Sequence, residues 1–434
     1  MTDLLIRNAW IVPGADGAAP FRGALAVSGG RIEALIPGGE AEPRAAETID
    51  AQGGVVAAGL VNTHCHAPDS LFRGLVENLP LEPWLQTVWK AEGAILSEET
   101  CRIGARLGFA ELALTGCTSV IDMFWHPEQS AHAGAEIGLR TSCGGLFFDF
   151  PGMDKRGPEG RAQECIDFFE AFPRTDMMVP GVFPHGSYTV GPEGLQKAHE
   201  ISSRYNGLYS VHAAETQAEN ADILNRYGNT VIRHMHKLGI LDERTVLAHC
   251  VHLDDEEIAI LAETRAVVAH NPVSNLKLAS GIARIPDMLK AGVRVTLGTD
   301  GAISGNDIDM WLALRLAAML HKGAAQDATL VTTEQAWRMA TLSGAEAMGL
   351  GDVTGSLEVG KYADLMLVDV NRPHAQPLFD PLTHLVYSAG KSDVTDVWVG
   401  GRRIVRGGKL ESFDIAPTLE QVKELTPKIA ASIA

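Results

Sequence analysis

Cysteine is sparse in this sequence, and its spacing excludes several kinds of site. The 434 residues include six cysteines, and no two of them form a Cys-x-x-Cys pair. The usual spacing of a thiolate zinc site is therefore missing, and the scattered cysteines suit a reducing compartment. We expect Cys65 and Cys250, which stand beside histidines, to pack as small apolar side chains.

Long hydrophobic runs and basic clusters are also missing. Nowhere do about eighteen apolar residues follow one another, and the first residues show no signal-peptide pattern. The formal net charge is −18, from 54 acidic and 36 basic residues, which disfavours nucleic acids and anionic membranes as partners. These absences predict a cytoplasmic protein that binds neither a membrane nor nucleic acid.

What the sequence does contain is typical of a globular protein with a sizeable core. Hydrophobic residues make up 46% of the chain and charged residues 21%. Because 434 residues exceed a usual single domain, we expect one large domain with a smaller one attached.

Short β-like runs are concentrated at the two ends of the chain. A Ser28-Gly29-Gly30 segment between two of the first runs indicates a hairpin turn. We expect residues 1–57 and 355–434 to form one small β-sandwich domain, with residues 58–354 inserted as a second domain. The runs are Leu4–Val12, Ala24–Val27, Arg31–Ile36, Thr48–Ala51, Leu365–Val370, Val394–Val399 and Arg402–Val405.

The inserted region alternates apolar, β-branched runs with amphipathic segments. Helical periodicity appears in residues 217–238, 254–264 and 308–321, among others. Eight alternating units predict an α/β fold, a (β/α)8 TIM-like barrel, with an open doubly wound sheet as the alternative. The candidate strands are Val55–Thr63, Thr118–Met123, Arg140–Phe148, Met177–Phe183, Leu208–Val211, Thr245–Ala248, Ala266–Ala269 and Arg294–Gly298.

Metal-binding or acid-base residues stand at the ends of five of the eight candidate strands. Because the carboxyl ends of barrel strands converge on one mouth, we expect these side chains to meet there. Each of them alone would more often be an ordinary hydrogen-bonding residue, so the shared placement carries the argument. The residues are His64, His66, His185, His212, Glu215, His249 and Asp300.

Two of these residues, His64 and His66, form a His-x-His pair at the end of the first candidate strand. In an extended strand their side chains point the same way, so they can share one metal ion. With His212 and Asp300 the set suits Zn²⁺ and is acceptable to Fe²⁺ or Mn²⁺, and a coordinated water would deprotonate near neutrality. We expect a single metal, since His185 ends the fourth candidate strand and no lysine lies close by to bridge a second.

Three residues are candidates for proton transfer. Asp300 and His249 are placed to take a proton from the attacking water. Glu215 follows His212 by three residues, so it can reach the cavity without binding the metal and carry a proton to the leaving group. The alternative for Glu215 is an acid at a helix N-terminus that accepts hydrogen bonds from backbone amides.

Several motifs together resemble the amidohydrolase superfamily, over nearly the whole chain. Within it, the chain is similar to the 5′-methylthioadenosine/S-adenosylhomocysteine deaminases, which neighbour the chlorohydrolases and triazine hydrolases. The motifs are Ala58 to His66, His212-Ala-Ala-Glu-Thr216, Ala248-His-Cys-Val-His252, Asn271 to Lys277, Leu297 to Gly301 and Gly355 to Asp364.

This resemblance implies hydrolytic deamination of an adenosine-type compound to the inosine analogue and ammonia. The substrate would be 5′-methylthioadenosine, S-adenosylhomocysteine or adenosine. The same four residues, His64, His66, His212 and Asp300, would bind one metal, as inferred above. The resemblance also implies that Glu215 protonates a ring nitrogen and that His249 assists the attacking hydroxide.

The resemblance further implies substrate contacts away from the reacting carbon. His185 would contact the substrate, and Arg161, at the start of a helix, would bind the distal part of the nucleoside. Glu92, which follows a segment containing Trp84, would hold the ribose hydroxyls but arrives one residue early. Trp84 and Trp125 either stack on the ring or pack in the core or rim.

Other functions stay open at this point. Trp125 and His126 can reshape the pocket for a triazine, a guanine analogue or a pterin. A hydrolase of cyclic amides could use the same ligands, and ammonia release would separate it from a deaminase. A non-catalytic barrel scaffold would be marked by lost ligands, and none is missing. Because barrels of this superfamily commonly associate, we expect a homo-oligomer.

Overall fold

The computed structural model describes residues 2–434, and its fifth and sixth strands show how the chain joins two sheets. β5 (Val55–Ala58) lies in a nine-stranded sheet, whereas β6 (Leu60–His66) is the first barrel strand. The prediction of one barrel strand over Val55–Thr63 is therefore wrong. A Cβ at the intervening Gly59 would lie 2.2 Å from Thr118 Cγ2, so only glycine fits where the chain crosses over.

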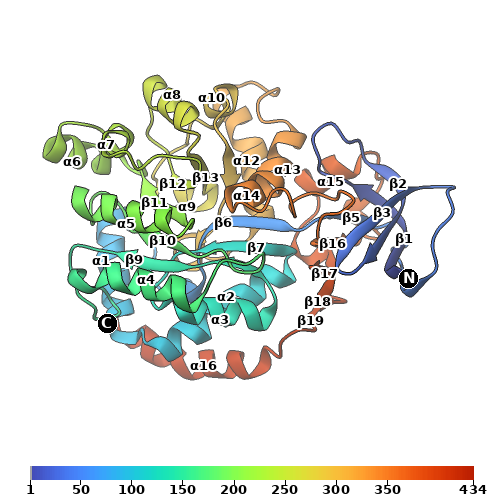
Figure 1. The fold of residues 1–434 in the computed structure, drawn as a ribbon, viewed down its shortest axis with the longest axis horizontal. Helices are drawn as coiled ribbons and strands as arrows, with labels where there is room; N and C mark the ends of the chain where they lie inside the picture. The colour runs from blue at the N-terminus through green and yellow to red at the C-terminus, as the bar shows by residue number, and fades with distance from the viewer. Residues whose placement is uncertain (1) are drawn as a thin grey trace.

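The nine-stranded sheet combines strands from both ends of the chain (Figure 1, right). Its order is β19-β18-β17-β16-β5-β1-β2-β3, with β4 paired to β1. The expected pairing of the two termini is thus confirmed, while the domain boundaries remain a prediction. The remaining strands are β1 (Thr2–Val12), β2 (Phe21–Ser28), β3 (Arg31–Pro37), β4 (Ala45–Asp50), β16 (Leu365–Val368), β17 (Val394–Val399), β18 (Arg402–Arg406) and β19 (Lys409–Leu410).

Two parallel sheets close into the barrel, with strand orders β14-β13-β12-β11-β10-β9 and β15-β6-β7-β8. β8 leads directly into β9, and β14 into β15, so the two sheets join on both sides around eight positions. The TIM-like barrel is confirmed and the doubly wound alternative is wrong. The barrel strands after β6 are β7 (Cys117–Asp122), β8 (Arg140–Ser142), β9 (Gly144–Phe147), β10 (Gly181–Pro184), β11 (Leu208–Ala213), β12 (Thr245–His249), β13 (Val267–His270), β14 (Val295–Leu297) and β15 (Asp300–Gly301).

Besides Val55–Thr63, two further expected strands differ clearly from those observed. The run Arg140–Phe148 is broken at Cys143, because its first part pairs with β7 and its second with β10. The run Met177–Phe183 starts as β10 only at Gly181. Pro180 lacks the N–H that a central strand would need at that point.

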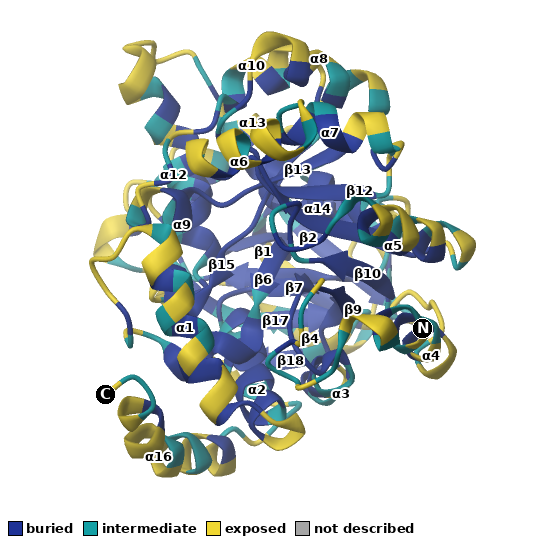
Figure 2. Cartoon of the chain, turned by 90° about the vertical axis from the view of Figure 1, so that its left-hand side faces the viewer, coloured by how far each residue is buried: buried dark blue, intermediate teal, exposed yellow. Residues whose placement is uncertain are grey.

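Helices surround the barrel, with buried faces toward the strands and exposed faces outward (Figure 2). The amphipathic segment 217–238 is two helices, α6 and α7, because Gly228 adopts a φ of +75° and ends the first. The helices are α1 (Leu81–Ile95), α2 (Glu98–Leu114), α3 (Pro127–Ile137), α4 (Arg161–Ala171), α5 (Pro192–Arg204), α6 (Gln217–Tyr227), α7 (Val231–Leu238), α8 (Asp255–Thr264), α9 (Pro272–Lys277), α10 (Ile285–Lys290), α11 (Ala302–Gly305), α12 (Met310–Ala325), α13 (Thr333–Ala340), α14 (Leu342–Ala347), α15 (Pro381–Tyr387) and α16 (Ala416–Ala431).

One buried ion pair connects the barrel to the terminal sheet. Arg140, on β8, donates from Nε and Nη2 to the two oxygens of Asp364, at 2.5 and 3.0 Å. Asp364 also accepts from Thr354 Oγ1 and from the Gly400 N–H, each at 2.6 Å. Both charged side chains are almost fully buried. The pair therefore links the barrel to the terminal sheet through a buried, charge-assisted contact.

The C-terminal helix α16 lies along the barrel helix α2, away from the sheet that precedes it (Figure 1). Ile429 of α16 is buried in an apolar cluster with barrel residues. Among the helices of residues 2–434, none has the length and apolar character needed to cross a membrane.

Candidate active site

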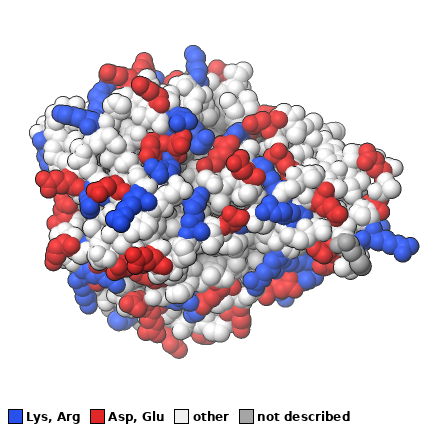
Figure 3. Space-filling view, viewed as in Figure 1, with Lys and Arg blue, Asp and Glu red and all other residues white. Residues whose placement is uncertain are grey.

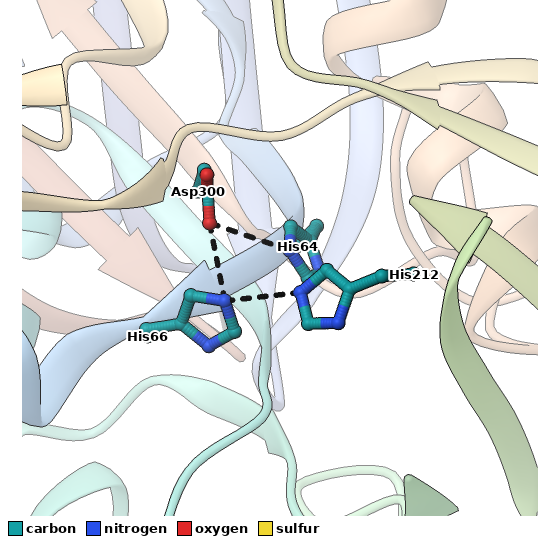
Figure 4. A group of neighbouring side chains, drawn as sticks. All are labelled: His64, His66, His212 and Asp300. Atoms are coloured by element: carbon teal, nitrogen blue, oxygen red, sulfur yellow. Dashed lines mark hydrogen bonds and ion pairs between the residues drawn. The ribbon is translucent and has the colours of Figure 1, made fainter. Parts of the chain in front are cut away.

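Four side chains meet at the mouth of the barrel, and Figure 4 shows them pointing toward one another. His64 and His66 come from β6, His212 from β11 and Asp300 from β15, and their candidate ligand atoms lie within 4.8 Å of one another. Asp300 Oδ1 lies 3.1 Å from His66 Nε2 and 3.5 Å from His64 Nε2. The four residues expected to bind a metal are thus brought together.

The hydrogen bonds of the histidines fit a metal site. His66 Nδ1 and His212 Nδ1 each lie 2.5 Å from a backbone carbonyl, of Met123 and His185 respectively. Since a carbonyl only accepts, both Nδ1 atoms carry protons, and in the neutral form of each ring Nε2 carries the lone pair. These two Nε2 atoms face each other at 3.3 Å. Such a pair repels unless a cation lies between the lone pairs, so the residues present fit a divalent metal ion.

The electrostatics of the cluster favour a positive charge. Burial lowers the pKa of His64 to about 4, so its imidazole is neutral. Burial opposes a charge on His66 as well, but the Asp300 carboxylate raises the pKa of His66 to about 9. Among residues 2–434, neither buried nitrogen of His64 has a hydrogen-bond partner. Ligation would satisfy one of them.

Asp300 is held in place by two serines. Its Oδ2 accepts from Ser274 Oγ at 2.6 Å and from Ser304 Oγ at 2.9 Å. Oδ1, the oxygen nearest the histidines, remains directed into the cluster. The serines therefore hold Oδ2 by hydrogen bonds and leave Oδ1 as the oxygen that can bind a metal ion.

Glu215 and His249 lie beside the cluster, both buried. His249 Nε2 is 3.8 Å from Glu215 Oε2, and Ser280 Oγ donates to Glu215 Oε1 at 3.0 Å. Burial raises the pKa of Glu215 above its ordinary value, which favours a carboxyl that can carry a proton at neutral pH. His249 Nδ1 lies 2.8 Å from Asn275 Oδ1. The short distance between Glu215 and His249 and the burial of both side chains suit a general acid and a general base that act in the same reaction.

The strand ends that carry these groups have strained backbone. Positive φ angles occur at Ala214, His249, Cys250 and Asp300, none of which is glycine. Such angles cost about 1–3 kcal/mol each and tend to gather at functional sites. Cys65 and Cys250 are buried, in keeping with the packing role expected for them.

Glu219, and not Glu215, is the acid that accepts a hydrogen bond from a backbone amide at the start of α6. Glu219 Oε2 accepts from the Glu215 N–H at 2.8 Å. Thr216 caps α6, so Glu215 precedes the helix and its side chain lines the cavity. Burial raises the pKa of Glu219 to about 8. Glu219 thus fixes the turn from which Glu215 projects.

An inner cavity opens at the cluster and is lined by residues from most barrel loops. Besides His66, Glu215 and Asp300, it includes four residues considered from the sequence as substrate contacts, Trp84, Glu92, Trp125 and His185. Trp125 Nε1 donates to Glu92 Oε2 at 3.1 Å, and burial raises the pKa of Glu92 to about 7. Trp84 and Trp125 are both buried and both line the cavity wall. Each can therefore pack in the protein interior and also contact the substrate.

A second, outer cavity of about 590 Å³ continues from the first. The two share the lining residues Leu81, Leu85, Tyr188, Glu215 and Leu278. The outer cavity lies between the loop before α1, the start of α6 and the loop after α9. It therefore offers room next to the reacting groups.

Arg161 does not line either cavity, contrary to its expected contact with substrate. Its Nη2 donates to Asp154 Oδ1 at 2.8 Å and its Nη1 to Glu164 Oε2 at 3.2 Å. The guanidinium lies 5.7 Å from the ring centre of Trp125. Two carboxylates satisfy the charge of Arg161, and the side chain supports Trp125 as part of the protein interior.

Several residues of the site could not be inferred as such from their sequence positions. Ser274 and Asn275 lie in the Asn271–Lys277 motif, which pointed to the family but not to their roles. Asp69, Trp89 and Phe148 line the inner cavity from segments without a distinctive pattern. For these residues, only proximity in the fold reveals a function.

Comparisons with known proteins agree with this geometry. The model of the group described as Amidohydrolase family matches residues 55–404. The 5-methylthioadenosine/S-adenosylhomocysteine deaminase of Desulforudis audaxviator is 40% identical, over 99% of this chain and 100% of its own. An adenosine deaminase of Xanthomonas campestris with bound zinc is 34% identical and superposes with a TM-score of 0.94 over 99% of each chain. Atrazine chlorohydrolase of Arthrobacter aurescens, complexed with zinc, is 24% identical with a TM-score of 0.89, covering 98% and 100%, and shares the fold.

Proposed function

Since the chain belongs to the amidohydrolase family, we propose that it is a metal-dependent aminohydrolase that converts an adenosine-type nucleoside to its inosine analogue and ammonia. The observation that carries this proposal is the placement of Glu215 and His249 beside the four-residue ligand cluster, within one cavity. The full-length relative named as a deaminase supports the reaction and the substrate class.

The metal site would be formed by His64, His66, His212 and Asp300. A bound divalent ion would supply the Lewis acidity that lets water act as a nucleophile at neutral pH. We propose zinc, because three imidazoles and one carboxylate suit it and because the Xanthomonas neighbour contains it. Iron(II) and manganese(II) are the alternatives that the ligand types allow.

The side chains around the cluster supply the proton transfers. Glu215 donates a proton to a nitrogen of the adenine ring, which makes the adjacent carbon electrophilic. His249 and Asp300 receive a proton as water adds to that carbon. The proton taken from the water passes to the amino group, which leaves as ammonia while the carbon–oxygen bond remains. The hydroxyl left on the carbon then loses its proton to Glu215, which restores the carboxyl group. Water is thereby divided between the product carbonyl and the departing ammonia.

The rest of the inner cavity would hold the nucleoside. Trp84 and Trp125 offer aromatic faces, and His185, which stacks on Phe148, lines the same cavity. Glu92 is the candidate for the ribose hydroxyls, since its carboxyl group lines the same cavity. An aromatic wall with few polar groups suits a flat heterocycle.

A hydrolase of cyclic amides is the second candidate, since it could use the same ligands. Glu215 beside His249 favours the deaminase, because attack on an aromatic amidine-like carbon requires protonation of a ring nitrogen. Triazines, guanine analogues and pterins are less favoured substrates, since the relatives whose names mention triazine or guanine are below 25% identity.

The partners expected from the sequence follow from this function. Acidic and basic side chains are interspersed on the face shown in Figure 3, and the overall charge is −18. We propose a small-molecule substrate and no nucleic-acid partner, since an acidic protein repels phosphate backbones. A cytoplasmic location and association into a homo-oligomer belong to the same proposal.

The deciding experiment is a screen for ammonia release. The protein would be tested with adenosine, 5′-methylthioadenosine, S-adenosylhomocysteine, guanine, a pterin and melamine. We expect ammonia only from the adenine nucleosides, with loss of activity after chelation and recovery on addition of zinc. Ammonia from none of the nucleosides, or full activity without metal, would contradict the proposal.

A further inference from the structure

Building on the proposed metal site, we propose that Asp69 is a positioning residue for that site. Asp69 is not one of the four clustered residues. It links the segment that follows His66 to the segment that follows Asp300, and it thereby sets the separation of these two ligands across the cluster.

The strand that carries Asp300 needs support from side chains because it is very short. β15 has two residues, and it pairs with β6 through Asp300 with Cys65 and Gly301 with His66. The φ angle of Asp300 is +60°, a conformation that costs free energy in a residue other than glycine. Asp300 Oδ1 nevertheless lies 3.1 Å from His66 Nε2 (Figure 4). Contacts beyond the strand pairing must therefore hold Asp300 in place.

Asp69 reaches this segment from η1 (Ala67–Phe72), a 3₁₀ helix that begins directly after His66. Asp69 Oδ1 accepts a hydrogen bond from the N–H of Ala302, the first residue of α11, at 2.8 Å. The N-cap residue of α11 is Gly301, which has no side chain that could accept from the helix. Asp69 thus caps α11 from a distant part of the sequence.

The other oxygen of Asp69 lies against the backbone of Gly301. A Cβ at Gly301 would lie 1.7 Å from Asp69 Oδ2, so only glycine fits here while Asp69 keeps its position. Ser304 of α11 donates to Asp300 Oδ2 at 2.9 Å. A displacement of α11 would therefore move the support of the Asp300 carboxylate as well.

η1 provides a fixed base for the Asp69 side chain. All six residues of η1 are buried. The N–H of Ala67 donates to Asp122 Oδ1, at the end of β7, at 2.6 Å. Where α2 packs on η1, a Cβ at Gly104 would lie 2.3 Å from the Pro68 carbonyl oxygen, so the two backbones are in close contact. The position of Asp69 relative to the preceding metal ligand is therefore fixed.

Asp69 also lines the inner cavity, so a direct contact with substrate is the competing role. The two roles differ in what they predict for the protein without substrate. A residue that only contacts substrate leaves the metal affinity unchanged, whereas a residue that spaces two ligands alters it. The metal affinity of the substrate-free protein therefore decides between them.

The test is a competition titration of the full-length protein with zinc and a chromogenic chelator. We expect Asp69→Ala to lower the zinc affinity about 10- to 100-fold. Asp69→Asn keeps an oxygen that can accept from the Ala302 N–H, so it should stay within about threefold of the wild type. Asp380→Ala is the control, because it removes the carboxylate that caps α15 and should not change the affinity.

A second pair of variants tests the contact between Asp69 and Gly301. Gly301→Ala alone should lower the zinc affinity about tenfold, since the added methyl group displaces Asp69. Asp69→Ala removes the atoms in conflict, so adding Gly301→Ala to it should cause no further loss. Thermal unfolding of the metal-free proteins would show that each variant is folded, and either single variant can be compared with the double variant.

The outcomes separate the role of Asp69 from the proposed function. Equal losses in Asp69→Asn and Asp69→Ala would mean that charge and not position matters, and would overturn the inference. Unchanged zinc affinity in Asp69→Ala, or additive losses in the double variant, would overturn it as well and leave the deaminase intact. A wild-type protein that binds no zinc, iron(II) or manganese(II) would overturn the proposed metal site and the role of Asp69 with it.

Discussion

His249 Nδ1 and Asn275 Oδ1 lie 2.8 Å apart, and both side chains are buried. With the amide oxygen as acceptor, the imidazole proton sits on Nδ1, so the lone pair of Nε2 faces Glu215. Asn275 therefore sets the tautomer of the proposed base from a position that does not line the substrate cavities.

Replacing Asn275 by alanine should lower kcat about 10- to 100-fold, because His249 would lose the acceptor that fixes its tautomer. KM should change little, and the metal content should stay the same. Steady-state kinetics and metal analysis would check both. Asn371→Ala, near the terminal sheet, is the matched control. A raised KM with unchanged kcat would argue against this positioning role.

Replacing Glu215 by glutamine should reduce kcat/KM by at least about 1,000-fold, since the isosteric amide cannot carry the proton. Circular dichroism and the bound metal should be unaffected, because Glu215 is not one of the clustered ligands. The exposed Glu193→Gln change on α5 is the control and should leave activity unchanged. An active Glu215→Gln protein would refute the proton-transfer role.

The double change of Ser274 and Ser304 to alanine should weaken metal binding about 10- to 100-fold. Both hydroxyls support Asp300 Oδ2, and their loss frees the carboxylate to rotate. A competition titration with a chromogenic chelator would measure the affinity. Ser203→Ala, at the end of α5, should show the wild-type affinity. Unchanged affinity in the double variant would mean that Asp300 needs no such support.

The free energy of unfolding should depend on pH because of the buried carboxyl group of Glu219. Its pKa is raised by burial from 4.5 to about 8, so between these values the folded state holds a proton that the unfolded state has released. The free energy of unfolding therefore falls as the pH rises through this window. Glu219→Gln cannot titrate and should gain in Tm relative to the wild type between pH 5 and pH 9. A pH-independent difference would contradict this assignment.

Removing the carboxylate of Asp364 should destabilise the protein by about 3–5 kcal/mol, because Arg140 would remain buried without its partner. Thermal or urea unfolding would measure the loss. The exposed ion pair of Lys423 with Glu420 provides a contrast, since Glu420→Ala should cost less than about 1 kcal/mol. Similar losses in the two variants would show that burial of the Arg140 pair has little effect.

Much of the fold could be predicted because barrel strands are continuous apolar runs that end in polar residues. The residues of the ligand cluster were recognisable for the same reason, since His64, His66 and His212 lie at the ends of such runs and Asp300 follows another. The points at which the chain passes from one sheet to the other were harder to predict. The apolar pattern of residues 55–63 continues through Gly59, and only the close approach of Thr118 shows why the chain leaves one sheet there.

The substrate-binding residues were less predictable because their roles depend on neighbours distant in sequence. Arg161 begins α4 as expected, yet whether it faces substrate is decided by Asp154, which neutralises it. The roles of Asn275 and Ser274 depend on contacts with His249 and Asp300, about 26 residues away. Such pairings follow from barrel closure, which single-sequence periodicity does not specify.

The position of β5 between β1 and β16 has a consequence for biosynthesis. β1 and β5 leave the ribosome early, but β16 and Asp364 are translated about 300 residues later. Until then β5 keeps an open edge, and Arg140 of the barrel has no counter-ion. The last contacts of the native state thus await nearly the whole polypeptide, so the terminal sheet and the Arg140–Asp364 pair can be completed only late in synthesis.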